Sequence, residues 1–519
     1  MPETPDSIRS KQAAMRSVQH YIDECPMWAD GTILHSVPMT AMQWRIWSLA
    51  ASGKFFVGFV VFVTGVALPL ISREFGIAPA ESGLVGAASL LGILIGAVGL
   101  GGMADHFGRK TMFIAEMIIF VAFLAILVVC TNFTLLIICL FGLGLALGCD
   151  YPTAHMIVSE SIRSTSRGKL VLGAYTFQAV GALSGTAVGY FVLSADPSLD
   201  AWRWMYGAAI LPAVAVTVGR FYITESANWL HVRGATEQAE AATQRLLLRT
   251  PLYPRIVTLV RDTVPATDGH THLTGLRALF GAGTRRATIL AAVPWFLQDL
   301  SSYGIGIFTP IILAAALGDK VDHIRSDSDL ILYDMFAAKG AAMIDTQLIV
   351  GIVVAMLLTD RVGRIRLQMA GFVGCAVGLF IAAMGSDFAG GTQVAAIVTG
   401  FMLFNFMTNL GPSSHTYLIA GEVFPTAIRG TGAGFAAAVG KCGAVASAFL
   451  FTVLRADIGS GLVLFILVAT SALGAVVTWA FRIETAGVSL EEIGRSTRET
   501  WPDTGLRGPD APSDEKKLA

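Results

Sequence analysis

Residues 101–110 read Gly-Gly-Met-Ala-Asp-His-Phe-Gly-Arg-Lys and form a short polar segment between two apolar ones. Residues 82–100 before it and residues 112–129 after it are almost wholly apolar. A connection this short predicts two adjacent antiparallel helices, and its charges have to lie at a water interface because they are costly inside a bilayer. A degenerate second copy, Thr-Asp-Arg-Val-Gly-Arg-Ile-Arg at residues 359–366, follows 255 residues later, counted from Asp105 to Asp360. Two copies half a chain apart indicate a membrane protein of two related halves.

Composition supports that class. Hydrophobic residues make up 54% of the chain and charged residues 14%, against roughly 25% charged in soluble proteins. Twelve apolar segments reach the length of about 20 residues that a bilayer crossing needs. They fall at residues 46–70, 82–102, 111–130, 133–157, 170–193, 204–222, 287–315, 342–358, 366–386, 392–419, 428–454 and 460–482. We therefore predict an all-α membrane protein with twelve transmembrane helices in two six-helix halves.

The polar stretches divide the chain further. We expect an N-terminal segment (1–45), a six-helix bundle (46–222), a linker (223–286), a second six-helix bundle (287–482) and a tail (483–519). Within the linker, the Ala- and Glu-rich residues 236–248 predict a surface helix. Residues 316–341 are mixed in charge and predict an external loop or cap.

Basic residues predict the orientation, because the cytoplasmic loops of membrane proteins are enriched in Lys and Arg. One side receives Arg109, Lys110, Arg163, Arg167, Lys169, the linker arginines, Arg361, Arg364, Arg366, Arg429, Arg495 and Arg498. The short loops of the other side carry only Arg73, Arg203 and Arg455. We expect both termini and the linker to be cytoplasmic and the protein to lie in the plasma membrane.

The two halves with a related loop in each resemble the major facilitator superfamily. Residues 224–230, Thr-Glu-Ser-Ala-Asn-Trp-Leu, resemble the Pro-Glu-Ser-Pro-Arg-Trp-Leu ending of that family's helix 6, and residues 484–493 resemble the ending of its helix 12. The resemblance covers nearly the whole chain except both tails. It implies a transporter, not an enzyme, with acid–base pairs at the cytoplasmic mouth that latch the two halves and then break. The gating groups so implied are Asp105, Arg109, Glu160 with Arg167, Glu225, Asp360, Arg364, and Glu422 with Arg429.

Within the superfamily, the chain is most similar to phosphate:proton and organic-acid:proton symporters. Residues 149–152, Cys-Asp-Tyr-Pro, resemble their Gly-Asp-Tyr-Pro signature, Gln178 lies where they keep a glutamine, and residues 409–426 resemble their helix 10 and its exit. The substrate-binding residues that this resemblance implies are Asp150, Tyr151, Gln178, Trp295, Asp299, Tyr303 and Lys441.

The charges inside the spans are the informative part. Trp295, Asp299 and Tyr303 are spaced i, i+4, i+8 and share one helical face, and Lys441 lies near mid-membrane among small residues. The lysine can hold an oxyanion or neutralise Asp299, and either Asp299 or Asp150 can take up the coupled proton. The alternative is a purely structural salt bridge. Likewise, Glu116 is either a proton relay or a structural partner of the nearby basic loop.

At three positions the residues of this chain depart from the symporter pattern, and these departures put phosphate as the substrate in doubt. Val57 and Val60 replace two acids on helix 1, and Leu140 replaces an arginine on helix 4. Acid and base are lost together, which suggests the loss of an ion pair. Lys54 on helix 1 either snorkels to the interface or adds positive potential to an anion path.

The sequence thus predicts a secondary transporter that works by alternating access and imports a small anion with protons. The alternatives are a proton-coupled carrier of an organic acid, sugar or drug, and a transport-dead sensor that binds solute without flux. We expect a monomer whose partners are a small-molecule substrate, protons and the lipid bilayer. We expect no nucleic acid, metal or cofactor; in particular, no nucleotide-binding motif stands in a suitable context.

Overall fold

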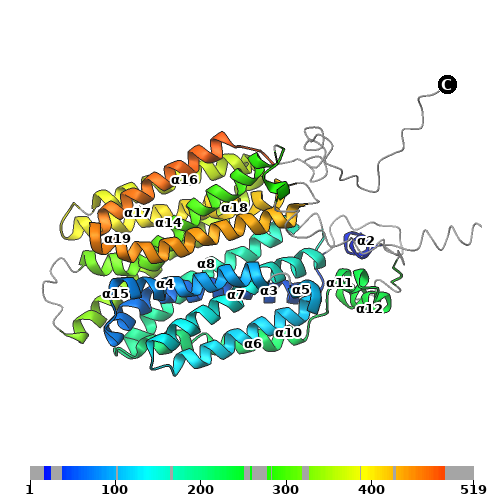
Figure 1. Ribbon diagram of the computed structural model, residues 1–519, viewed down its shortest axis with the longest axis horizontal. Helices are drawn as coiled ribbons and strands as arrows, with labels where there is room; N and C mark the ends of the chain where they lie inside the picture. The colour runs from blue at the N-terminus through cyan, green and yellow to red at the C-terminus, as the bar shows by residue number, and fades with distance from the viewer. Residues whose placement is uncertain are drawn as a thin grey trace, which may run out of the picture.

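The computed structural model folds into two bundles of long helices that lie side by side, one from each half of the chain (Figure 1). The structure describes residues 17–24, 38–100, 103–163, 167–249, 257–259, 277–281, 283–317, 326–385, 387–424 and 428–485. This part of the chain contains helices and no strand.

The first bundle contains the six crossings of the N-terminal half. Its elements are α3 (Ala41–Phe75), α4 (Pro79–Ile95) continued by η1 (Gly96–Leu100), α5 (Met103–Phe107), α6 (Arg109–Val128), α7 (Phe133–Ser161), α8 (Arg167–Ala195), α9 (Ala201–Gly207) and α10 (Ile210–Phe221). The short α5 lies in the loop 101–110, and α9 and α10 together form one crossing, Ala201–Phe221.

The second bundle repeats this plan. Its elements are α14 (Arg285–Leu317), α15 (Asp327–Val362), α16 (Arg364–Gly385), α17 (Gly391–Leu410), α18 (Pro412–Glu422) and α19 (Arg429–Ala480). In the described part, eleven helical segments are long and apolar enough to cross a membrane. The last of them, α19, is two crossings joined at Gly459, whose φ of 80° and ψ of 161° interrupt the helix. The predicted all-α fold with twelve crossings is confirmed.

The predicted external loop at 316–341 is wrong over most of its length, because α15 already begins at Asp327. The Ser326 hydroxyl accepts a hydrogen bond from the Asp329 N–H at 3.3 Å, and Asp327 and Asp329 lie in the first turn. A serine cap and acids at a helix N-terminus stabilise the helix start. A search for apolar residues alone misses such a polar first turn.

The linker contributes α11 (Ala227–Val232) and α12 (Thr236–Leu247), so the surface helix predicted there is confirmed. These helices and α2 (Val18–Asp23) lie beyond one end of the bundles (Figure 1). We call this end, which also carries Arg109 and Arg364, the basic end, and the opposite one the far end.

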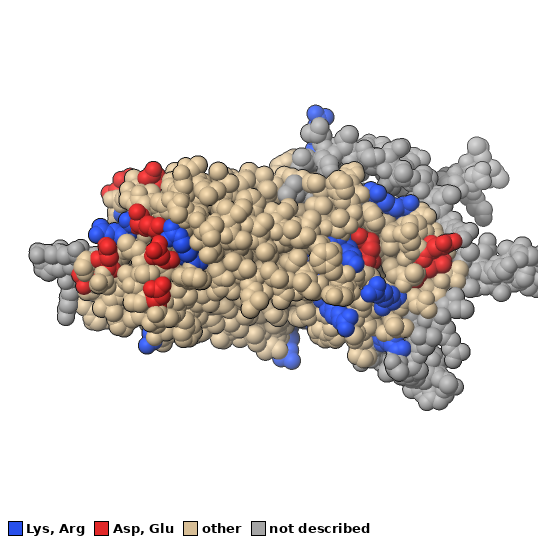
Figure 2. All heavy atoms as spheres, turned by 90° about the horizontal axis from the view of Figure 1, so that it is seen from below, with Lys and Arg blue, Asp and Glu red and all other residues tan. Residues whose placement is uncertain are grey.

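The outer surface fits a lipid environment. Figure 2 shows one side of the molecule, on which charged residues gather toward the two ends and the middle is mostly uncharged. Large apolar side chains such as Phe191, Leu211 and Leu357 are more than half exposed. Exposed apolar helices of this length are stable in a bilayer, where every backbone group is bonded within its own helix. The chain is a multi-pass integral membrane protein.

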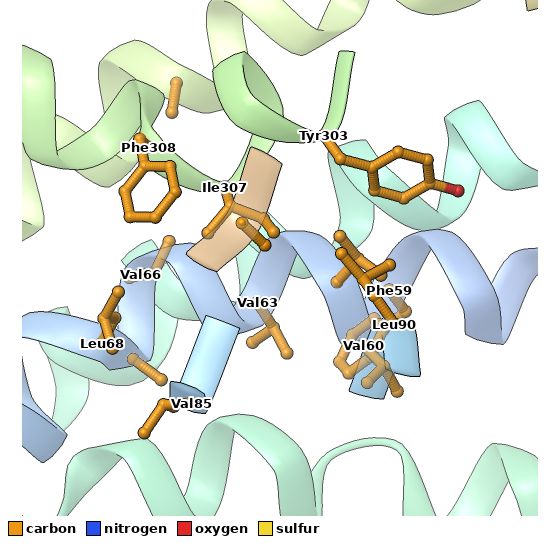
Figure 3. Packing of buried hydrophobic residues seen from close by; sticks show 14 of the residues in the cluster. Phe59, Val60, Val63, Val66, Leu68, Val85, Leu90, Tyr303, Ile307 and Phe308 are labelled. Carbon is orange, nitrogen blue, oxygen red and sulfur yellow. The ribbon is translucent and has the colours of Figure 1, made fainter. Parts of the chain in front are cut away.

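Contacts between the halves are made mainly by α4 with α19, α8 with α15, and α3 with α14. Gly65 of α3 lies against the Ile307 backbone of α14 so closely that a side chain there would collide with it. Figure 3 shows Val63 and Val66 of α3 in one apolar cluster with Ile307 and Phe308, whereas the Tyr303 hydroxyl points away from the cluster. This packing places Tyr303 where apolar core gives way to polar interior.

Candidate functional site

A small cavity of about 50 Å³ lies between the two halves. That volume admits a few water molecules. The first half contributes Phe62 of α3 and Gln178 of α8 to its wall, and the second half contributes α14, α15, α17 and α18. Its polar lining includes Tyr175, Gln178, Gln298, Asp299, Asn405 and Asn409. The cavity therefore presents one carboxylate among neutral amides and hydroxyls.

Lys441 of α19 is hydrogen-bonded to two residues that line the cavity, Asp299 and Tyr303. Its Nζ donates to Asp299 at 2.9 Å and to the Tyr303 hydroxyl at 2.8 Å, and the Trp295 ring packs against neighbouring Gly440. The shared face predicted for Trp295, Asp299 and Tyr303 is thus turned toward α19. Asp299 and Lys441 are 2% and 4% exposed, so in the low-dielectric interior this ion pair is far stronger than it would be in water.

A tyrosine closes the cavity toward the basic end. Tyr175 lines both the central cavity and a second one of about 20 Å³, which also contacts Lys54 and His155. The Tyr175 hydroxyl is hydrogen-bonded to Ser413 at 2.9 Å, and its ring stacks on Tyr417 at 5.5 Å. His155 Nδ1 is hydrogen-bonded to the Tyr417 hydroxyl at 2.9 Å. These contacts join α7 and α8 of the first half to α18 of the second.

The structure places Asp150 in a charged cluster inside the first half, whereas the cavity lining contains Asp299. The Arg220 guanidinium donates to Asp150 at 2.6 Å and to Glu116 at 2.7 Å, and all three side chains are buried. Within the described part of the chain, the ion-pair partner of Glu116 is Arg220 of α10, and no pairing of Glu116 with the basic loop is seen there. The arginine also stacks on the Phe113 ring at 3.4 Å.

Lys54 belongs to the same cluster. It is 5% exposed, so the interpretation that it snorkels to the interface is wrong. It is attracted electrostatically by Asp150 and Glu116, and Gly53 beside it packs directly on the Asp150 carboxylate. With Arg220, these residues form a set of two acids and two bases with no net charge, which lowers the cost of burying each.

The positions that depart from the symporter pattern are filled by apolar core. Val57, Val60 and Leu140 are fully buried in one hydrophobic cluster that includes residues of both bundles. A charge at any of these positions would have to be desolvated. Apolar side chains thus fill these three positions, and the buried charges of the first bundle gather in the cluster around Arg220.

The loop of the first half is held by two acids. The Glu225 carboxylate accepts the Lys110 N–H at 3.0 Å, which satisfies a donor at the start of α6. Glu160 pairs with Arg109 at 3.6 Å and accepts a hydrogen bond from the Ser226 hydroxyl.

The loop of the second half repeats the arrangement. Glu484 accepts the Arg364 N–H at 3.1 Å, Glu422 pairs with the Arg364 guanidinium at 3.3 Å, and the Thr485 hydroxyl donates to Glu422 at 2.6 Å. The internal repeat read from sequence is therefore a repeat of hydrogen bonds as well.

Both members of each of these described pairs lie in the same half, and the latch between the halves stays a prediction. Arg429, the expected partner of Glu422, is attracted electrostatically by that carboxylate and donates its Nε–H to the Phe424 carbonyl at 3.1 Å. The side chains of Asp105, Tyr151, Arg167 and Asp360 lie outside the described part of the structure. Among the described residues, Tyr175 and His155 make hydrogen bonds between the halves.

Several residues of the site were not found from the sequence. Arg220 falls two residues before the predicted end of its helix, where an arginine is ordinary. Tyr175 and Tyr417 lie in apolar helices, in which a tyrosine carries no signal. Asp345 could have been found, because it is an acid inside a predicted span.

Family comparison agrees with this architecture. The model of the family described as "Sugar (and other) transporter" matches residues 46–496. The chain belongs to this family of the major facilitator superfamily, whose members are membrane transporters of sugars, metabolites or phosphate and not enzymes.

Individual relatives extend the comparison. The chain is 28% identical over 465 residues to the niacin transporter NiaP of Acinetobacter baylyi, covering 89% of this chain and 98% of NiaP. It is 25% identical over 522 residues to a putative inorganic phosphate transporter of Schizosaccharomyces pombe, covering 88% and 89%. The xylose transporter XylE of E. coli, in a partially occluded inward-open conformation, has the same fold with a TM-score of 0.68 at 20% identity, covering 87% and 100%.

Proposed function

We propose that the protein is a proton-coupled secondary transporter that carries a small anion by alternating access. The observation that carries this proposal is the Lys441–Asp299–Tyr303 group at the wall of the central cavity. Asp299 and Tyr303 line the cavity, and Lys441 bonds both from behind. We further propose that the basic end is cytoplasmic, since Lys and Arg are enriched on that side of membrane proteins.

Charge balance supports the coupling. The Lys441–Asp299 pair is neutral, so an anion entering the cavity alone would bring an uncompensated negative charge into the low-dielectric interior. If Asp299 takes up one proton, Lys441 is left as the counter-ion of the substrate and the site stays neutral. Anion and proton therefore bind best together, which is the requirement for symport.

The closures around the cavity support alternating access. Toward the basic end, Tyr175 and Tyr417 separate the central cavity from the second one. Toward the far end, Gly65 and Ile307 bring the halves into backbone contact. A carrier needs two such closures that open in turn.

Relatives named for niacin and for inorganic phosphate support an anionic substrate. The neutral lining supports a second candidate, a sugar or other polyol. Gln178, Gln298, Asn405 and Asn409 offer amide groups, which can both donate to and accept from hydroxyl groups. In that case, the Lys441–Asp299 pair would couple proton movement to transport, and neither residue would bind a charged group of the substrate.

Uptake into proteoliposomes containing the purified protein tests the proposal. Labelled phosphate, nicotinate and xylose would be offered with and without an inward proton gradient. We expect accumulation of one of the two anions that a protonophore abolishes. Accumulation of xylose alone would favour the polyol carrier, and binding without uptake of any solute would favour the sensor.

A further inference from the structure

Acids with no cationic partner occur on α15. Five acids are buried inside the membrane-crossing helices of the described part: Glu116, Asp150, Asp299, Asp334 and Asp345. Arg220 pairs with the first two and Lys441 with the third. The remaining two, both on α15, form no ion pair with any described residue. A buried carboxylate without a counter-ion is very costly in its charged form.

Asp345 lies one helical turn from the cavity on its far-end side. Leu348, about one turn from Asp345 along α15 toward the basic end, lines the cavity. Ala182 of α8, one turn from Thr186 in the same direction, lines it as well. Asp345 Oδ2 accepts from the Thr186 hydroxyl of α8 at 3.2 Å, and Oδ1 accepts from Asn405 Nδ2 of α17 at 3.1 Å. The carboxyl group thus joins the first half to the second at the level where the cavity is closed.

Thr186 can form a hydrogen bond with Asp345 in either protonation state of the carboxyl group. Besides Asp345, its oxygen lies 3.0 Å from the Leu183 carbonyl of its own helix. A hydroxyl has one hydrogen and two acceptor positions. With Asp345 ionised, Thr186 donates to the carboxylate; with Asp345 protonated, the carboxyl donates to Thr186, which then donates to Leu183.

Asp334 lies on the same face of α15, eleven residues nearer the far end. Eleven residues make three turns and about 16 Å of helix. Asp334 is 1% exposed, and neither of its carboxylate oxygens has a hydrogen-bond partner in the described part of the chain. A proton that enters from the far end would meet this group before Asp345.

No ionisable group in the described parts of the surrounding helices holds Asp345 in one protonation state through a hydrogen bond or an ion pair. α15 packs against α8, α17, α14, α3 and α16. Away from the charged residues at their ends, these helices carry the ionisable side chains Lys54 of α3, Tyr175 and Tyr190 of α8, Asp299 and Tyr303 of α14, and Cys375 of α16. α15 itself carries Tyr333, Asp334 and Lys339, of which Lys339 is exposed. None of them hydrogen bonds Asp345, whose partners within the described part are Thr186 and Asn405.

We propose that Asp345 is a proton-binding residue that closes the far end of the cavity, with Asp334 as the group through which protons reach it from that end. Proton binding keeps the contact between α8 and α15 without burying a charge. When the far end opens, water solvates the carboxyl group, which then exchanges its proton with the far-side solution. This inference rests on the proposed proton coupling and adds a second protonation site to it.

Infrared difference spectroscopy of the purified protein, between an acidic and an alkaline pH, reads buried carboxyl groups without needing the substrate. We expect a carbonyl band of protonated carboxyl in the wild type that Asp345→Asn reduces and that the exposed control Asp387→Asn leaves unchanged. Thr186→Val, which keeps the acid but removes its partner, should shift the band without abolishing it. A band that is identical in the wild type, Asp345→Asn and Thr186→Val would overturn the proposal.

The same variants separate this inference from the proposed function. If Asp345→Asn removes the band while wild-type uptake ignores the proton gradient, the proton site stands and symport fails. If uptake depends on the gradient and Asp345→Asn changes neither the band nor the uptake, symport stands and this site is wrong.

Discussion

The Tyr303 hydroxyl accepts a hydrogen bond from Lys441 Nζ at 2.8 Å and another from Gln178 Nε2 at 3.3 Å. Lys441 lies in the second half and Gln178 in the first, so one phenol links the buried ion pair to the opposite bundle. The proposed protonation of Asp299 would therefore act on a residue that is hydrogen-bonded across the two halves. This is the physical coupling that a symporter needs between ion binding and conformation.

Replacing the lysine tests whether its charge serves the substrate. Lys441→Gln keeps a hydrogen-bond donor but removes the charge, whereas Lys441→Arg keeps both. A hydrogen bond to a charged group contributes about 1.5–3 kcal/mol, so we expect Lys441→Gln to weaken anion affinity by about 10- to 100-fold. Affinity for a neutral solute should change little. Equal losses for anionic and neutral solutes, together with a lower melting temperature, would indicate a purely structural salt bridge.

Asp299→Asn should separate accumulation from exchange. The amide has the shape of the protonated acid but cannot release a proton. Proteoliposomes with this variant should lose gradient-driven accumulation and still exchange labelled for unlabelled substrate. Asp387→Asn, at an exposed position, provides a control of equal chemistry. Accumulation at the wild-type level would move the coupling site to another acid.

Arg220 is expected to be the charge on which the stability of the first bundle depends most. Arg220→Met leaves Glu116 and Asp150 without their common partner, and breaking a buried pair costs about 3–5 kcal/mol. The control is Arg73→Met, which breaks a half-exposed pair with Asp327 of the kind that contributes about 0–1 kcal/mol. Thermal unfolding in detergent measures both. Arg220→Met together with Glu116→Gln should recover part of the loss, since one buried charge disappears.

The two loop glycines should not tolerate a side chain. Gly108 and Gly363 have φ of 98° with ψ of 150° and 155°, a region that only glycine occupies without strain of about 1–3 kcal/mol. A Cβ at either would also press on the carboxylate of Glu225 or Glu484. Gly108→Ala should therefore lower the melting temperature more than the control Gly234→Ala. Gly234 also has a positive φ, 78°, but has open space around it.

If Gly108→Ala and Gly234→Ala lower the melting temperature equally, backbone strain alone explains the effect. The hydrogen bond from Lys110 N–H to Glu225 would then be dispensable for the loop.

The number of crossings, the two-fold repeat and the division between a basic end and a far end could all be predicted from the amino-acid sequence. Each of these follows from local rules. A bilayer demands apolar stretches of one length, a charged loop has to reach water, and lysine and arginine gather on one side. The pairing of Asp299 with Lys441 was also predictable, because each charge inside the membrane needs a partner.

Which charged residue pairs with which other one depends on the packing of the helices and could not be predicted in the same way. Asp150 was expected at the cavity, but α7 packs against α6 and α3, and its Asp150 pairs with Arg220 of α10. Lys54 lies too deep to reach the interface, and the acids of the loops pair inside each half. The contact of Asp345 with the first half is made by Thr186, which lies 159 residues away along the chain. Such partners depend on how each helix is rotated and shifted against its neighbours, and hydrophobic periodicity in one helix carries no information about the next.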